Sequence, residues 1–178
     1  RTERHPTPDR AAWEASAATA ISVIRQGMLD KVVLAREERL LADAEFAPVS
    51  TLARLRASDA AATLFARQSG SLWFIGATPE RLVRLAGERV DVSCLAGSIG
   101  IGRSPRERQR LAASLLVSGK DREEHEIVVR STMAALEEVC EDVARLIPEP
   151  RVVAARSVQH LETPLTATLS AARQVLDL

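Results

Sequence analysis

Residues 89–119 read RVDVSCLAGSIGIGRSPRERQRLAASLLVSG, and the change from strand to helix inside this stretch decides the fold. Residues 89–95 predict the second strand of a hairpin that turns at Ala86-Gly87-Glu88. The glycines at 97, 100 and 102 predict a loop. The following Ser104-Pro105-Arg106-Glu107 is typical of a helix N-terminus, with a serine cap and a proline in the first turn. The order is therefore strand, glycine-rich loop, helix.

Working outward, strands dominate before this stretch and helices after it. Strands are predicted over residues 31–41, 63–66, 72–75, 81–85 and 151–158. Helices are predicted over residues 8–28, 50–57, 104–118 and 121–147, and a last helix starts within residues 170–178. Strands in a run followed by helices predict an α+β fold rather than a doubly wound sheet.

Composition excludes several classes of protein. The 178 residues carry 24 basic and 24 acidic side chains, so the formal net charge is zero. A neutral chain without a basic run is unlike a protein that binds nucleic acid or an anionic membrane. We also expect no membrane span and no secretory signal. Cys94 and Cys140 form no CxxC pair, which favours a reducing cytoplasm.

Two side chains are candidates for acid–base chemistry. Only Lys31 and Lys120 among the basic residues are lysines, and a lysine, unlike arginine, can lose its proton when buried. Lys31 lies at the mouth of a predicted strand and could act as a base; the alternative is that both lysines lie on a solvated surface. Glu80 follows a proline directly after another predicted strand, which favours a rigid turn. The alternative is a solvent-facing glutamate beside Arg81.

Carboxylates gather in KDREEHE, residues 120–126, at a predicted helix start. Glu124 lies four residues before Val128 and therefore shares a face with the apolar stripe. Carboxylates alone would suit Mg²⁺ rather than zinc, although a favourable interaction with the helix dipole also explains acidic residues here. His125 and His160 are more typical of structural histidines than of catalysts. The glycine-rich segment lacks the features of a phosphate-binding loop.

Taken in order, five segments resemble the chorismate-utilising enzymes, in particular the isochorismate synthase and salicylate synthase branch. The segments are KVVLAR (31–36), FIGATPERLV (74–83), LAGSIGIG (95–102), KDREEHEIVV (120–129) and VQHLETPL (158–165). The resemblance implies an α+β fold like that of anthranilate synthase component I. It implies that residues 1–178 are part of a chorismate-binding catalytic domain, shortened at both ends and lacking the family's C-terminal half.

The resemblance also implies roles for six residues. Lys31 would be the general base that activates water, and Glu80 the general acid that protonates the departing hydroxyl. Glu124 would be a ligand of the cofactor Mg²⁺. Gly97, Ser98 and His160 would contact the substrate. A lysine base needs its pKa lowered from about 10.4 by about 3 units, and the acid needs its pKa raised, so we expect both side chains to be partly desolvated.

The implied reaction is the conversion of chorismate to isochorismate, by addition of water at C2 and loss of the C4 hydroxyl. Aminating members of the family typically carry glutamine where this chain has Lys31, and aminodeoxychorismate synthases often carry lysine where it has Ala96. The alternatives are a salicylate synthase, which goes on to eliminate pyruvate, and an inactive chorismate-binding segment.

The sequence leaves other properties of the protein open. It does not decide whether the product feeds menaquinone, siderophore or salicylate synthesis. It also leaves the oligomeric state open, with a monomer slightly favoured. For residues 1–178 alone we expect little or no activity, because the segment that holds a second Mg²⁺ glutamate in the family has no match here.

Overall fold

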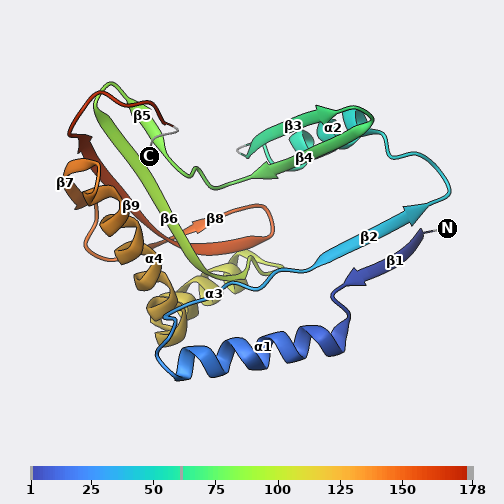
Figure 1. The fold of residues 1–178 in the computed structure, drawn as a ribbon, viewed down its shortest axis with the longest axis horizontal. Coiled ribbons are helices and arrows are strands. Elements are labelled where there is room, and N and C mark those ends of the chain that lie inside the picture. The colour runs from blue at the N-terminus through green and yellow to red at the C-terminus, as the bar shows by residue number, and fades with distance from the viewer. Residues whose placement is uncertain (1, 61, 176–178) are drawn as a thin grey trace. The chain divides into compact units, whose positions relative to one another are not determined.

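The computed structural model describes residues 2–60 and 62–175, and the chain divides into two compact units, Arg1–Thr51 and Leu52–Leu178 (Figure 1). The first unit contains a two-stranded sheet and one helix. The second contains a hairpin, a five-stranded antiparallel sheet and two helices that pack on that sheet. Over the described residues, no helix combines the length and apolar character needed to cross a bilayer.

In the first unit, β1 (Thr2–Thr7) pairs antiparallel with β2 (Glu37–Ala42), and α1 (Arg10–Arg25) connects them. The predicted helix begins two residues late because Thr7 pairs with Glu37 in the sheet, and Asp9 caps the helix by accepting from the Ala12 N–H at 2.9 Å. The predicted strand at residues 31–41 is wrong in its first half. Strand β2 starts at Glu37, where its partner β1 ends, so Lys31 does not lie on a strand.

The second unit begins with a helix and a hairpin that agree with the prediction. Helix α2 (Pro48–Ser58) crosses the boundary between the units, and β3 (Thr63–Ser69) pairs with β4 (Leu72–Thr78) in full antiparallel register. Gly70 makes the turn with a φ of 59°, a backbone conformation in which a side chain would be strained.

The five-stranded sheet is built around β9 (Val158–Leu169), a strand that the sequence analysis did not predict. Its neighbours are β6 (Arg89–Gly100) on one side, and β7 (Cys140–Arg145) and β8 (Arg151–Ala154) in succession on the other. The short β5 (Arg84–Ala86) forms the predicted hairpin with β6. Pro164 is tolerated inside β9 because β8 pairs only as far as Glu162 and β7 begins to pair at Leu165.

Two helices pack on this sheet, α3 (Pro105–Val117) and α4 (Gly119–Glu137), and Figure 1 shows α4 running along β6 and β9. The capping motif is confirmed, since the Ser104 hydroxyl accepts from the Glu107 N–H at 3.2 Å. The predicted helix over residues 121–147 ends early, because residues from Cys140 onward pair with β9 instead. The helix predicted within residues 170–178 is not formed in residues 170–174, and residues 176–178 lie outside the described residues.

The core lies between α4 and one face of the sheet. Alternate residues of β6 and β9 point towards α4, as expected for strands with one covered face. The buried members of this cluster are Val90, Cys94, Val129, Leu136, Cys140, Leu165, Ala167 and Leu169. The glycine-rich loop is also a correction: Gly97 and Gly100 belong to β6, which continues because β9 pairs with it as far as Gly100.

Candidate functional site

A β-bulge at Gly97 shapes the candidate site. Ala96 pairs with Leu161 and Ser98 pairs with His160, so Gly97 is an extra residue without a partner on β9. Its φ is 74°, and a Cβ atom at this position would lie 3.1 Å from the Asp121 Cβ atom and 3.3 Å from a Leu161 methyl group. A glycine is required here for both reasons, and the bulge lies directly against the start of α4.

The bulge brings together the predicted substrate residues Ser98 and His160. They are 62 positions apart in the sequence, yet the Ser98 hydroxyl lies 2.7 Å from Nδ1 of His160. Ser98 is exposed and His160 is half-buried. This contact joins β6 to β9 on the sheet face opposite α4, because the neighbouring Leu161 and Ala96 are buried.

A cavity of about 410 Å³ opens on that same face, and His160 lines it. The other lining residues include Ser93, Leu95, Pro79, Arg156 and Glu162. The cavity therefore combines apolar walls with histidine, guanidinium and carboxylate groups, as small-molecule sites commonly do.

Glu162 is a polar residue of this cavity that the sequence analysis missed. It accepts hydrogen bonds from the Ser93 hydroxyl and from Arg151 Nε, both at 2.6 Å. Burial by itself would raise the pKa of Glu162, but these two hydrogen bonds and the charge of Arg151 together lower it below its usual value. The signal was the period of two in H-L-E, which places His160 and Glu162 on one face once the segment is known to be a strand.

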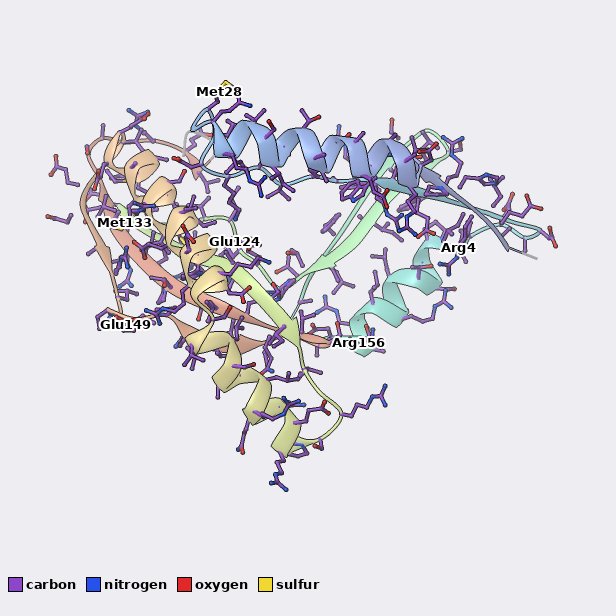
Figure 2. The ribbon with its side chains drawn as sticks, turned by 90° about the horizontal axis from the view of Figure 1, so that it is seen from below. Arg4, Met28, Glu124, Met133, Glu149 and Arg156 are labelled. Carbon is purple, nitrogen blue, oxygen red and sulfur yellow. The ribbon has the colours of Figure 1, made fainter. Side chains whose placement is uncertain are left out.

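Helix α4 places Glu124 and His125 next to each other, but in different surroundings. Glu124, labelled on α4 in Figure 2, is half-buried, in agreement with the predicted inward direction. His125 is buried; its Nδ1 lies 3.2 Å from the Ala96 carbonyl oxygen and its Nε2 lies 2.8 Å from the Thr163 hydroxyl. Burial lowers the pKa of His125, so the neutral imidazole is favoured.

An interaction with the helix dipole does not account for all the acidic residues of segment 120–126. Helix α4 starts at Gly119, and Asp121 is the acidic residue of its first turn, so Glu123, Glu124 and Glu126 lie further along. Glu126 forms an ion pair with Arg145 at 2.5 Å, and the hydrogen bond from Arg145 lowers the pKa of Glu126.

The residues described here do not form a metal site on their own. Among residues 2–60 and 62–175, no three His, Cys, Asp or Glu side chains are grouped closely enough to hold a metal ion. Glu124 is therefore a single carboxylate here, whereas Mg²⁺ prefers octahedral coordination by several oxygen atoms.

Glu80 follows β4 in a turn, as predicted. Its N–H donates to the Thr78 hydroxyl at 3.1 Å, and Pro79 separates the two residues. The Glu80 side chain is exposed, so the expected partial desolvation is not found in this chain. Glu80 lines a second cavity, of about 490 Å³, together with Cys94, Thr132 and Leu136.

Lys31 belongs to the first unit, whereas the other five predicted site residues belong to the second. Its side chain is half-buried, in the segment between α1 and β2. The structure thus brings Gly97, Ser98 and His160 together. Glu124 directly precedes His125, which contacts Ala96 on β6, the strand that carries Gly97 and Ser98.

The fold and this site define a class of protein, which comparison with known families identifies. The model of the family described as "Chorismate binding enzyme" matches residues 1–178. The chain belongs to this family.

Within the family, the chain is similar to isochorismate synthases. It is 42% identical to the "Salicylate biosynthesis isochorismate synthase" of Pseudomonas aeruginosa over 171 residues, which are 96% of this chain and 35% of that protein. It is 36% identical to the isochorismate synthase MenF of Bacillus subtilis, again over 96% of this chain and 36% of that protein. The chain thus spans about a third of the length of these curated relatives.

Solved structures confirm the predicted fold. MenF of Escherichia coli, a menaquinone-specific isochorismate synthase, superposes with a TM-score of 0.89 at 27% identity, over 98% of this chain and 40% of that chain. Anthranilate synthase component I of Streptococcus pneumoniae superposes with a TM-score of 0.78 at 22% identity, over 99% of this chain and 38% of that chain. The α+β fold is that of anthranilate synthase component I, of which this chain forms under half.

Proposed function

We propose that the protein is an isochorismate synthase, which converts chorismate to isochorismate with Mg²⁺ as cofactor. The observation that carries the proposal is Lys31. The relatives of this chain include isochorismate synthases and anthranilate synthase components, and a lysine at this position favours activated water over ammonia as the nucleophile. Arginine could not take this role, because its guanidinium does not lose its proton in proteins.

In the proposed reaction, the chain moves two protons. Lys31, in its neutral form, takes a proton from a water molecule whose oxygen forms a bond to C2 of chorismate. The ring double bonds shift, the bond between C4 and its hydroxyl oxygen breaks, and Glu80 donates a proton to that oxygen, so that water leaves. One hydroxyl is gained and one is lost, and the product is an isomer of the substrate.

Substrate binding is assigned to the bulge on β6 and its neighbour on β9. Gly97 has no side chain, so a ligand can approach the backbone closely there. If the Ser98 hydroxyl donates to His160 Nδ1, the Nε2–H of His160 is free to donate to an oxygen of the substrate. Chorismate carries two carboxylates and a hydroxyl, which supply such acceptors.

Glu124 is proposed as one ligand of Mg²⁺. A bound Mg²⁺ would offset the charge of a substrate carboxylate and orient the ring. Glu124 is half-buried. It lies near the bulge in space although the two are distant in sequence, because its neighbour His125 contacts Ala96. The remaining oxygen donors are assigned to the substrate, water and other parts of the whole protein.

The test is to incubate the whole protein with chorismate and Mg²⁺ and to separate the products by chromatography. We expect isochorismate. Salicylate would identify a salicylate synthase, anthranilate formed with an ammonium salt would identify an aminating enzyme, and no turnover by the folded protein would contradict the proposal. The base is tested with Lys31→Arg. Lys120→Arg is the matched control for that variant, because Lys120 is the second lysine of the chain and is exposed.

A further inference from the structure

His125 is a buried polar side chain that the proposed reaction does not use. Its relative exposure is 2%, and both of its ring nitrogens have partners on two different strands, Ala96 of β6 and Thr163 of β9. A carbonyl oxygen can only accept a hydrogen bond, so Nδ1–H donates to Ala96. Nε2 is then the acceptor, and the Thr163 hydroxyl donates to it.

These two hydrogen bonds reach the sheet at the bulge. Ala96 is the residue directly before Gly97, and the carbonyl bound by His125 belongs to the peptide that leads into the bulge. Asp121, one helical turn before His125, lies beside the bulge, since a Cβ atom added at Gly97 would be 3.1 Å from the Asp121 Cβ atom. The first two turns of α4 are therefore attached to the strand at the point where Ser98 is turned towards His160.

The same side chain is joined to the proposed metal ligand. Glu124 directly precedes His125, so rotation or translation of this part of α4 moves both residues together. A packed apolar residue in place of His125 would fill the core, but it would not fix the position of the helix against one particular carbonyl group.

We propose that His125 is a positioning residue that holds the Glu124 carboxylate in register with the substrate-binding bulge at Gly97 and Ser98. This inference rests on the proposed function, since it gives Glu124 and the bulge their roles. His125 itself touches neither substrate nor metal; it acts through the hydrogen bonds to Ala96 and Thr163.

Two substitutions separate the two hydrogen bonds. In His125→Asn the amide nitrogen takes the place of Nδ1 and can still donate to the Ala96 carbonyl, whereas in His125→Gln the amide reaches the place of Nε2 and leaves that carbonyl without its donor. Val129→Ala is the matched control, because Val129 is fully buried on the same helix and contacts the core rather than the bulge.

The measurements are made on the whole protein. We expect His125→Gln to lower kcat/KM for chorismate and the affinity for Mg²⁺ by about 10–100-fold, the usual range for a residue that orients a ligand. His125→Asn should restore most of both values. Val129→Ala should lower the unfolding temperature while changing kcat/KM less than about threefold. Amide exchange at Gly97 and Ser98 should become faster in His125→Gln and not in Val129→Ala.

Two results would overturn the inference. One is a His125→Gln protein that unfolds at a lower temperature but keeps its Mg²⁺ affinity and kcat/KM, which would make His125 a core residue only. The other is unchanged exchange at Gly97 and Ser98. Absence of turnover in the parent protein would count against the proposed function instead, while the exchange and Mg²⁺-binding measurements would still decide the role of His125.

Discussion

The two units of the chain differ in how much they bury. From Glu3 to Thr51 no residue is buried, and every residue of β2 is exposed. In the second unit, β6 and β9 bury alternate side chains, and α4 contributes Val129 and Leu136 to the same cluster. In the first unit the backbone forms hydrogen bonds within α1 and between β1 and β2, but the unit removes little apolar surface from water.

This difference concerns function as well as stability. Gly97, Ser98, His160 and Glu124 lie on elements whose positions are determined by a packed core in this chain. Lys31 lies in the first unit, which has no buried core of this kind over its described residues. We therefore expect the candidate site residues of the second unit to be held more precisely than Lys31. Four experiments test this contrast and the packing of the second unit.

The largest effect is expected from Lys31→Arg in the whole protein. Arginine stays protonated where the proposed base must be neutral, so we expect kcat to fall by about 10²–10⁴-fold, the usual contribution of acid–base catalysis, with little change in unfolding temperature. Steady-state kinetics and thermal unfolding measure both. A rate near that of the parent protein would show that Lys31 is not the base, and Lys120→Arg should behave as the parent does.

The next effect concerns the core itself. Leu165→Ala should lower the free energy of unfolding by about 2–5 kcal/mol, because Leu165 is fully buried between the sheet and α4. Leu41→Ala in β2, where the side chain is 50% exposed, should change it by less than about 0.5 kcal/mol. Denaturant unfolding of both variants is the measurement. Equal losses would mean that the first unit is as well packed as the second.

The bulge gives a smaller and more specific effect. Gly97→Ala and Gly87→Ala both place a side chain at a positive φ, 74° and 64°, at a cost of about 1–2 kcal/mol. Only at Gly97 would the new Cβ atom also crowd Asp121 and Leu161, whereas nothing lies within 4 Å at Gly87. Gly97→Ala should therefore be the more destabilising and should raise KM for chorismate. Equal behaviour of the two variants would contradict a role for the bulge.

The smallest effect is a pH dependence from Glu162. Its pKa is lower in the folded protein than in the unfolded chain, so its contribution to stability is present above the unfolded pKa and is lost as the pH falls through the folded pKa. We expect the free energy of unfolding to fall more steeply below about pH 4.3 in the parent than in Glu162→Gln. Parallel pH profiles would show that the Ser93 and Arg151 contacts do not favour the ionised form.

The sequence predicted local structure well where the signal was local. The hairpin of β3 and β4, the serine cap of α3 and the turn after β4 agree with the structure because caps and turns depend on a few adjacent residues. The predictions failed where pairing was distant. The segment with His160, Glu162 and Pro164 lacks the appearance of a strand, and it becomes one because the distant β6 pairs with it from Val158 to Thr168.

The sequence by itself determined the family of this protein and six candidate residues, because five ordered segments resemble those of the family and carry these side chains. Only the tertiary structure decided that Gly97 is a bulge inside a strand, that Ser98 contacts His160, and that Glu162 and His125 belong to the surroundings of the site. The physical reason is that register and burial depend on which distant segments meet. A strand pairing between Ser98 and His160, and a helix held on Ala96 by a buried imidazole, leave no pattern in adjacent residues.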